Sequence, residues 1–239
     1  MKPAVPPEGG FKGPVYTLAG AGPQALQAHE LPIDLDALVP GEGLWEVEIG
    51  FGKGRYLLKQ VLENPGRRFL GIEIVSKYWR LLADRDRKRG RGNLLNVRGE
   101  ALQILATLLP RGFASRVHVY FPDPWPKSRH HRRRLFDPET VDLVLGALAP
   151  GGELVFATDF LEYGGLVRAI LESHPDLEVT IHEGQWPDGA RTNYEAKFIE
   201  EGRPILRLIA RLRDGATERR LHPQGESRLA NAWAPHRDD

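Results

Sequence analysis

The sequence predicts an α/β protein with a mostly parallel, doubly wound sheet. Apolar segments of strand length alternate with longer helical segments from residue 44 to residue 173, and short connections join them. Parallel neighbours in a sheet need a crossover between them, and a helix usually provides it. This alternation therefore favours a parallel sheet over an antiparallel one.

Each element in the alternation has a local signal. The strands are short apolar runs, and the helical segments are longer. Proline ends two of the helices, at Pro110 and Pro150, and Ser76 is the expected N-cap of another. In chain order we expect strand 44–49, helix 55–63, strand 69–74, helix 76–89, strand 94–98, helix 100–109, strand 117–121, helix 138–148, strand 153–158 and helix 161–173.

Two more strands, 177–182 and 205–211, come after the last crossover, with a helical stretch near 195–201 between them. A shorter unit joins them, so they could form an antiparallel pair at one edge of the sheet, as mixed sheets often do. The predicted fold class is therefore a mostly parallel sheet with an antiparallel edge strand.

The chain of 239 residues suits one domain with appended segments. Residues 1–40 are rich in proline and glycine and are expected to form an N-terminal arm. Residues 41–212 contain the alternating elements and are the predicted catalytic domain. The polar residues 213–239 are expected to form a tail or arm.

Composition excludes several kinds of site and favours a cytoplasmic protein. Without cysteine the chain has no disulfide, zinc–thiolate site or cysteine nucleophile. No apolar run is long enough to span a membrane, and the N-terminus lacks the apolar core of a signal peptide. The net charge is only +1, but arginine and lysine gather at 85–91, 127–134 and 211–220, and such patches attract polyanions.

The first predicted strand leads into a glycine-rich turn that favours a nucleoside cofactor. Glu48 is followed by Gly50, Gly52 and Gly54, and alternate glycines let a backbone turn tightly and approach a ligand. About twenty residues later the second strand ends in Glu73, where a carboxylate can bind both ribose hydroxyls of an adenosine.

The same turn discriminates between cofactors. It lacks the third glycine of the dinucleotide fingerprint, and the chain has no phosphate-binding loop of the P-loop kind. Glu48 would repel a pyrophosphate but suits an ammonium or sulfonium ligand, so we expect S-adenosylmethionine and not NAD. Glu100 follows the third strand and is placed to meet the adenine edge; alternatively it is a first-turn acid that favours the helix dipole.

The fourth strand ends in a proline-rich turn that joins a carboxylate to a basic run. Residues 121–127 read FPDPWPK and hold Asp123, Trp125 and Lys127 in one rigid turn. Five cationic side chains lie within residues 127–134, which indicates a polyanionic substrate. Alternatively Asp123 only caps a turn and the arginines form a solvated face, but Trp125 and the prolines interrupt any helical face.

Together these motifs resemble the bacterial single-subunit family of tRNA (guanine-N7-)-methyltransferases. The resemblance covers roughly residues 44–210, and its most specific part is the FPDPWPK turn with the basic run behind it. The family more often has aspartate at the position of Glu100. The matching segments are 48–54 (EIGFGKG), 71–73 (GIE), 121–127 (FPDPWPK), 129–135 (RHHRRRL), 157–159 (ATD) and 192–195 (TNYE).

The resemblance implies a Rossmann-like class I methyltransferase fold and methyl transfer from S-adenosylmethionine to N7 of a guanine in the tRNA variable loop. It also implies three sets of site residues. The cofactor set is Glu48, Gly50, Gly52, Gly54, Glu73, Glu100 and Asp123, of which Asp123 is also the catalytic candidate. The substrate set is Lys127, Asp159, Thr192, Asn193, Tyr194 and Glu195, and the RNA-binding set is Arg129, His130, His131, Arg132, Arg133 and Arg134.

The expected partner is tRNA, with no membrane, no obligate protein partner, and a monomer or homodimer as the assembly. His130 and His131 have no acidic or histidine partner at ligand spacing, so we expect them on the RNA surface and not at a metal ion.

The implied reaction needs no general base, because N7 of guanine carries a lone pair and no proton. The enzyme has to position the reactants and stabilise the positive charge that passes to guanine, and Asp123 is the candidate for this. Asp159 or Glu195 could accept hydrogen bonds from guanine N1–H and its N2 amine. Trp125 either stacks on a base or keeps the turn rigid.

Two other functions stay open at this stage. Residues Asp123 to Trp125 partly match the D-P-P-[YW] turn of enzymes that methylate an exocyclic base nitrogen, although Trp125 displaces the second proline. The other is a non-catalytic tRNA-binding protein of the same fold, against which the glycines and acids of the cofactor set argue. Identification of the methylated nucleoside and a titration with cofactor separate the three.

Overall fold

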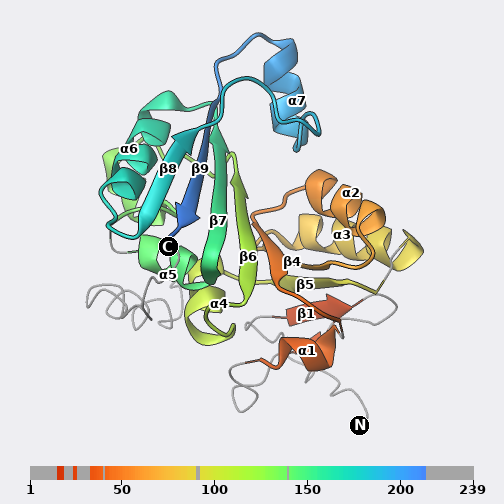
Figure 1. Cartoon of the computed structure of the whole chain (residues 1–239). Coiled ribbons are helices and arrows are strands. Elements are labelled where there is room, and N and C mark those ends of the chain that lie inside the picture. Colours follow the sequence, from red (N-terminus) through yellow and green to blue (C-terminus); the bar gives the residue numbers. More distant parts are fainter. Residues whose placement is uncertain are drawn as a thin grey trace.

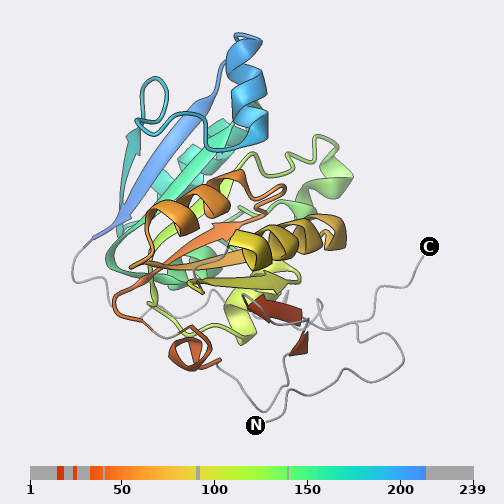
Figure 2. The same ribbon diagram turned by 90° about the vertical axis from the view of Figure 1, so that its right-hand side faces the viewer.

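The computed structural model describes residues 15–18, 24–25, 33–39, 41–89, 92–138 and 140–213. Its described part is a nine-stranded sheet with helices on both faces (Figure 1, Figure 2). The strands follow the order β2-β1-β5-β4-β3-β6-β7-β9-β8 across the sheet.

The elements alternate as the sequence predicts. The strands are β1 (Val15–Leu18), β2 (Gln24–Ala25), β3 (Trp45–Ile49), β4 (Arg68–Glu73), β5 (Leu94–Arg98), β6 (Ala114–Tyr120), β7 (Leu148–Thr158), β8 (Leu177–Ile181) and β9 (Leu206–Leu212). The helices are α1 (Leu35–Leu38), α2 (Arg55–Glu63), α3 (Ser76–Arg89), α4 (Ala101–Thr107), α5 (Val141–Gly146), α6 (Leu161–Glu172) and α7 (Asn193–Glu200), with a 3₁₀ helix at Ser128–Arg133.

The middle of the sheet is parallel and one side is mixed. Strands β5, β4, β3, β6 and β7 pair in parallel, while β9 pairs antiparallel with both β7 and β8. The predicted antiparallel pair is therefore confirmed; the reversed strand β9 lies one place in from the edge, and β8 forms the edge itself. Because the central strands share one direction, their carboxyl ends meet at one edge of the sheet, where ligands bind in open α/β folds.

The central strands are buried on both faces, which explains their nearly continuous apolar sequence. On one face, Val47, Ile72 and Val119 pack in the core that also contains residues of α4, α5 and α6. On the other face, Phe69 and Leu94 pack against α2 and α3. Trp79, Leu82 and Asp86 of α3 are its buried residues, and their spacing of three and four places them on one side of the helix.

Most element boundaries match the predictions within a few residues, and the largest difference is at β7. This strand begins at Leu148, inside the predicted helix 138–148, and passes through Pro150 to Thr158. At Gly152 an added Cβ would lie 2.8 Å from the carbonyl oxygen of Ala149, so the close approach of the backbone requires glycine there. Ser76, expected as an N-cap, is the first residue of α3.

The second edge of the sheet contains strands that the sequence analysis did not anticipate. Within the predicted arm 1–40, β1 pairs antiparallel with β5, and β2 pairs with β1. An exposed edge of β5 accepts such a short strand through backbone hydrogen bonds, which depend little on its side chains. The tail predicted beyond residue 213 lies outside the described residues. No described helix is long and apolar enough to cross a membrane.

Candidate functional site

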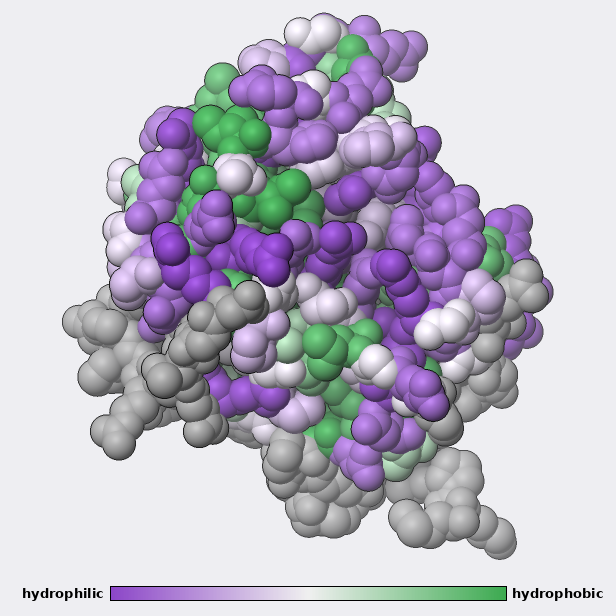
Figure 3. Space-filling model, in the orientation of Figure 1, coloured by the Kyte–Doolittle hydropathy of each residue, from purple (hydrophilic) through white to green (hydrophobic). Residues whose placement is uncertain are grey.

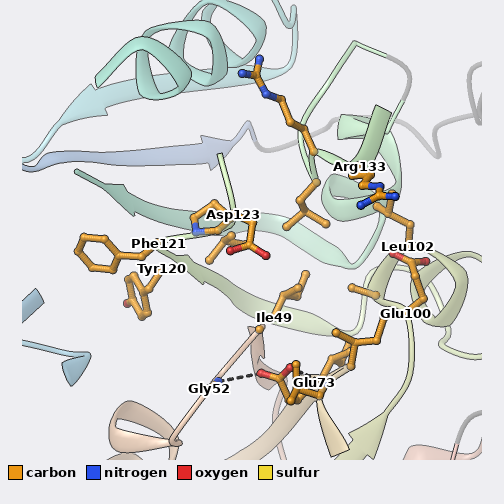
Figure 4. A pocket seen from close by; sticks show the side chains of 18 of the residues that line it. Ile49, Gly52, Glu73, Glu100, Leu102, Tyr120, Phe121, Asp123 and Arg133 are labelled. Atoms are coloured by element: carbon orange, nitrogen blue, oxygen red, sulfur yellow. Dashed lines mark hydrogen bonds between the residues drawn. The ribbon is translucent and has the colours of Figure 1, made fainter. Parts of the chain in front are cut away.

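A cavity of about 660 Å³ opens at the carboxyl edge of the sheet. Its walls come from the loops after β3, β4, β5 and β6, with Tyr194 of α7 beside them. Figure 4 shows Glu73 and Glu100 on one side of this space and Asp123 with Phe121 on the other. Motifs that are far apart in the sequence therefore share one cavity.

The glycine-rich turn enters this cavity between β3 and α2. Gly50 and Gly52 line the cavity, and Gly52 has a φ of 53°, in the left-handed region that disfavours side chains. Gly54 has a φ of 67°, and an added Cβ there would lie 2.7 Å from Leu82 of α3. The turn thus depends on glycine for its backbone conformation at Gly52 and also for packing at Gly54.

Glu73, at the end of β4, holds the glycine turn in place. Its Oε2 accepts a hydrogen bond of 2.9 Å from the Gly52 N–H (Figure 4), and its Oε1 accepts one of 2.8 Å from the Val75 N–H. A carboxylate has about four acceptor positions, so lone pairs stay available to ribose hydroxyls after these two bonds.

Glu48 is buried near the glycine turn and is not part of the cavity lining. It is only 2% exposed, and its Oε2 has no hydrogen-bond partner among the described residues. Burial raises the pKa of Glu48 well above 4.5, and the nearby charge of Glu73 adds to this, against a hydrogen bond from the backbone of Leu57. The Glu48 carboxyl therefore keeps its proton to a higher pH than an exposed glutamate does.

Glu100 is both a helix cap and a residue of the cavity lining. It is the N-cap of α4, where its Oε2 accepts a hydrogen bond of 2.7 Å from the Gln103 N–H. It also lines the cavity, on the same side as Glu73 (Figure 4). The capping hydrogen bond fixes the Glu100 carboxylate in the cavity that the glycine turn also lines.

The turn that carries Asp123 is strained. Phe121 has a φ of 52° and Trp125 a φ of 43°, in a region that costs a residue with a side chain about 1–3 kcal/mol. Neighbouring groups oppose this strain: the Phe121 N–H donates to the Ala157 carbonyl at 2.7 Å, and the phenyl ring lies 5.5 Å from that of Phe198. Asp123 is exposed at the cavity, with no hydrogen bond or ion pair to another described residue.

The basic run divides into a surface part and a buried part. Arg129 and Arg133 are exposed on the 3₁₀ helix, and the guanidinium of Arg133 lies 4.9 Å from the centre of the Trp125 ring. Arg134, by contrast, is buried; its Nε donates to the Pro124 carbonyl at 2.8 Å, and its guanidinium lies over the ring of Tyr163. Arg134 thus holds the turn with a buried guanidinium, whereas Arg129 and Arg133 are exposed, and Arg133 also lines the cavity.

The remaining residues of the basic run lie on the same 3₁₀ helix or directly before it. The ring of His130 meets that of Trp125 edge-on at 5.7 Å, and His131 is partly buried with no partner for its Nε2 among the described residues. Lys127 is exposed and precedes this helix. The side chain of Arg132 lies outside the described part of the chain.

The segment 192–195 lies at the start of α7 and is held in place by side-chain caps. Thr192 is the N-cap, and its Oγ1 accepts from the Glu195 N–H at 2.9 Å. Glu195 is fully buried: its Oε1 accepts from Arg207 Nε at 2.9 Å, and its Oε2 accepts from the Arg191 N–H at 2.8 Å. Tyr194 is 60% exposed and lines the cavity, so only one of these two neighbours reaches the cavity.

Asp159, at the end of β7, is ion-paired with Arg203, in the loop after α7. It is not in the cavity lining, nor are Lys127, Asn193 and Thr192. Of the predicted site residues, the cavity brings together Gly50, Gly52, Glu73, Glu100, Asp123, Arg133, Arg134 and Tyr194.

Sequence reasoning missed the apolar part of the cavity. Ile74 is 63% exposed and Val75 is 45% exposed, and both line the cavity with Tyr78 and Leu102. An apolar pair directly after the acid at a strand end was a visible signal, since such residues are usually covered by something. A flat apolar ligand such as an adenine ring would cover them.

Comparisons with known proteins show the family of this chain. A protein-family model described as "Putative methyltransferase" matches residues 43–208. The chain is 37% identical over 177 residues to the tRNA (guanine-N(7)-)-methyltransferase of Nitrosococcus oceani, covering 74% of this chain and 75% of that protein. It is 39% identical over 186 residues to the protein of the same name from Alkalilimnicola ehrlichii, covering 77% and 78%.

Solved structures with low sequence identity share the fold. The 16S rRNA methyltransferase KamB matches with a TM-score of 0.57 at 15% identity, over 83% of this chain and 99% of that chain. A 30S ribosomal A1408 methyltransferase from an uncultured bacterium matches with a TM-score of 0.55 at 20% identity, with the same coverage. The predicted Rossmann-like methyltransferase fold is thereby confirmed.

Proposed function

The chain belongs to the tRNA (guanine-N(7)-)-methyltransferase family, and from this premise we propose that it methylates N7 of a guanine in the variable loop of tRNA, with S-adenosylmethionine as the methyl donor. One observation carries the proposal at the level of the site. The glycine turn and Glu73 share a single cavity with the Asp123 turn and with Tyr194. A donor held on one side of this cavity would face a base held on the other.

The residues on the first side suit S-adenosylmethionine. Glu73 has acceptor positions for ribose hydroxyls, and the apolar pair Ile74 and Val75 with Leu102 suits an adenine ring. The two acids on this side of the lining, Glu73 and Glu100, favour a positively charged ligand and disfavour a pyrophosphate. We assign Gly50, Gly52, Glu73 and Glu100 to direct contact with the cofactor. Glu48 and Gly54 support the turn from outside the lining.

When bound, the cofactor supplies a methyl group on a sulfonium centre. The protein then has to hold guanine N7 in line with that methyl group and to exclude water. Asp123 has free acceptor positions at the cavity, and its carboxylate stabilises the positive charge that develops on the guanine ring. Two hydrogen bonds keep this carboxylate in position against the strain of the turn: Phe121 N–H donates to the Ala157 carbonyl, and Arg134 Nε donates to the Pro124 carbonyl.

We assign guanine recognition to Tyr194 in the cavity lining and to Asp159, at the end of β7. Tyr194 offers an open aromatic face on which a base extruded from the tRNA core can stack. Both oxygens of Glu195 are engaged within the protein, so of the two predicted acceptors for guanine N1–H we favour Asp159, whose partner Arg203 is partly exposed. Lys127, Arg129 and Arg133 supply cations for the phosphates.

We propose that tRNA is the only partner this enzyme needs. The enzyme would act as a monomer or a homodimer, in the cytoplasm. Within the described residues no group of three or more histidine and acidic side chains is arranged to hold a metal ion, and methyl transfer to N7 does not need one. Size-exclusion chromatography with light scattering would determine the assembly.

The decisive experiment is nucleoside mass analysis of unmodified tRNA after incubation with the protein and S-adenosylmethionine. Wild type should produce 7-methylguanosine. Asp123→Asn, which removes the charge and keeps the shape, should lower turnover by about 10²-fold or more, with tRNA affinity within about twofold. Asp84→Asn, on the exposed side of α3, is the matched control and should behave as wild type.

The outcomes separate the competing functions. Methylation at an exocyclic nitrogen would keep the fold and cofactor but overturn the target atom. Absence of any methylation, together with no rise in melting temperature on addition of S-adenosylmethionine, would favour a non-catalytic tRNA-binding protein. Full turnover by Asp123→Asn would contradict the assigned role of the carboxylate.

A further inference from the structure

A buried polar cluster lies directly behind the Asp123 turn, and the reaction described above does not use it. It consists of Glu46 of β3, Tyr56 of α2, His118 and Tyr120 of β6, and Arg191 of the loop between β8 and α7. Its members come from four separate parts of the chain. Glu46, His118 and Tyr120 are at most 5% exposed.

Arg191 lies in a cage of three aromatic rings. Its guanidinium carbon is 4.3 Å from the centre of the Trp186 ring, 5.4 Å from that of Tyr56 and 5.9 Å from that of Tyr120. Its Nη1 donates to the Tyr120 hydroxyl at 2.7 Å, and its Nε donates to Asp188 Oδ1 at 3.0 Å. A flat guanidinium stacks on aromatic rings and still donates from its edge in two directions, whereas a lysine ammonium has no planar face to stack.

The hydrogen bonds of Arg191 continue inward through β6 to β3. The Tyr120 hydroxyl lies 2.9 Å from His118 Nδ1, and His118 Nε2 lies 3.3 Å from Glu46 Oε2. Burial raises the pKa of Glu46, but His118 and Arg67 together outweigh it and lower this pKa to about 2; burial lowers the pKa of His118. We therefore assign a neutral His118 with its proton on Nε2, so that Tyr120 donates to Nδ1 and accepts from Arg191.

Both ends of the Arg191–Tyr120 contact adjoin the substrate side of the cavity. Tyr120 directly precedes the strained Phe121 and the turn that carries Asp123. Arg191 directly precedes Thr192, the N-cap of α7, and its own N–H donates to Glu195. One hydrogen bond therefore joins two segments that are 71 residues apart in the chain.

We propose that Arg191 is a positioning residue that sets the Tyr194 segment at a fixed place relative to the Asp123 turn, through its contact with Tyr120. The inference rests on the proposed function, because it assigns guanine to the space between these two segments. Arg191 does not line the cavity and touches no reacting group; it acts through Tyr120 and Glu195.

The arrangement predicts which parameters depend on Arg191. The Glu195–Arg207 ion pair still ties α7 to β9 when the Arg191 guanidinium is lost, so α7 stays folded but its place relative to Asp123 is no longer fixed. The cofactor side, with Gly52 and Glu73, has no hydrogen bond to Arg191. The turnover number should fall while cofactor affinity stays the same.

The test uses Arg191→Lys, Tyr120→Phe and the double variant in the full-length protein. Tyr120→Phe keeps the ring and removes only the hydroxyl, so it tests the contact if Arg191→Lys is unstable. Arg168→Lys, an exposed residue of α6 paired with Glu172, is the matched control. Measurements are kcat and KM with tRNA, and the Kd of S-adenosylmethionine by calorimetry.

We expect kcat for 7-methylguanosine formation to fall at least about tenfold in Arg191→Lys, because a small misplacement of reactants has effects of this size. KM for tRNA and the cofactor Kd should stay within about threefold of wild type. The double variant should be no slower than Arg191→Lys, since both single changes break the same contact.

Three results would overturn the inference. Unchanged kcat in both single variants would show that the contact does not position the reactants. Loss of cofactor affinity in parallel with kcat would show a general structural role. If wild type makes no 7-methylguanosine at all, the proposed function fails and this inference fails with it, whereas an active wild type with equally active variants overturns only the role of Arg191.

Discussion

At the residue scale, the site depends on four acidic side chains that have the same chemical group but different surroundings. Glu73 accepts two backbone hydrogen bonds, Glu100 caps a helix, and Asp123 is exposed at the cavity. Glu48 is buried with an unpartnered oxygen. Burial raises the pKa of Glu48, whereas Glu73, Glu100 and Asp123 line the cavity, where a positively charged ligand can meet them.

Glu48 gives a testable dependence of stability on pH. Its folded-state pKa is raised, so its contribution is fully present below the unfolded value near 4.5 and is lost as the pH rises toward the folded value. Glu48→Gln, which mimics the protonated acid, should match wild type in stability near pH 4 and exceed it at higher pH, by about 1.4 kcal/mol per pH unit between the two values.

Thermal unfolding of both proteins from pH 4 to pH 9 would measure this difference. Glu63→Gln, at an exposed position on α2, controls for the general loss of an acid. A difference between wild type and Glu48→Gln that stayed constant across the range would contradict a raised pKa.

At the element scale, the buried ion pair between Glu195 and Arg207 helps to hold α7 in position. Its N-cap Thr192 and its buried Glu195 connect it to the loop before it and to β9. The exposed Tyr194 on the same helix turn faces the cavity. A short helix with few buried residues keeps a defined place here because ion pairs and caps supplement its small apolar face.

Removal of the buried charge should therefore loosen α7. Glu195→Ala leaves Arg207 buried without its partner, and breaking such a pair costs about 3–5 kcal/mol. Glu172→Ala on α6, which breaks an exposed pair with Arg168, should cost at most about 1 kcal/mol. Urea unfolding of the two variants would give both values.

The same variant discriminates between two roles for Glu195. If Glu195→Ala keeps the stability of wild type but loses turnover, the carboxylate acts on guanine, as the family resemblance implies. Loss of stability together with turnover supports a role in holding α7.

At the scale of the whole molecule, binding of tRNA depends on where cations reach the surface. The net charge is only +1, so long-range attraction must come from local patches. Figure 3 shows hydrophilic surface over α2 and α3, and apolar surface over the upper ends of β8 and β9. The last turn of α3 contains the exposed Arg87, Lys88 and Arg89, and the 3₁₀ helix adds Arg129 and Arg133.

The basic run should therefore respond unevenly to mutation. Arg129→Gln with Arg133→Gln should weaken tRNA binding and reduce the slope of log affinity against log salt by about 1 per lost phosphate contact, with little change in stability. Arg134→Gln should instead lower stability, since it removes the bond to the Pro124 carbonyl. Filter binding at several salt concentrations, with thermal unfolding alongside, measures both effects.

Equal effects of all three changes on binding, with none on stability, would contradict the division of this run into a surface part and a buried part.

The sequence by itself determined the order of strands and helices from residue 44 onward, the glycine turn and the rigid turn around Asp123. These features depend on signals between close neighbours: apolar periodicity, glycine where φ is positive, and proline that restricts the chain. Only the tertiary structure decided that Arg134 is buried while Arg133 is exposed, that Glu195 pairs with Arg207, and that Arg191 reaches Tyr120. The burial and pairing of a charged side chain depend on which distant segments pack around it, and local patterns carry no information about that.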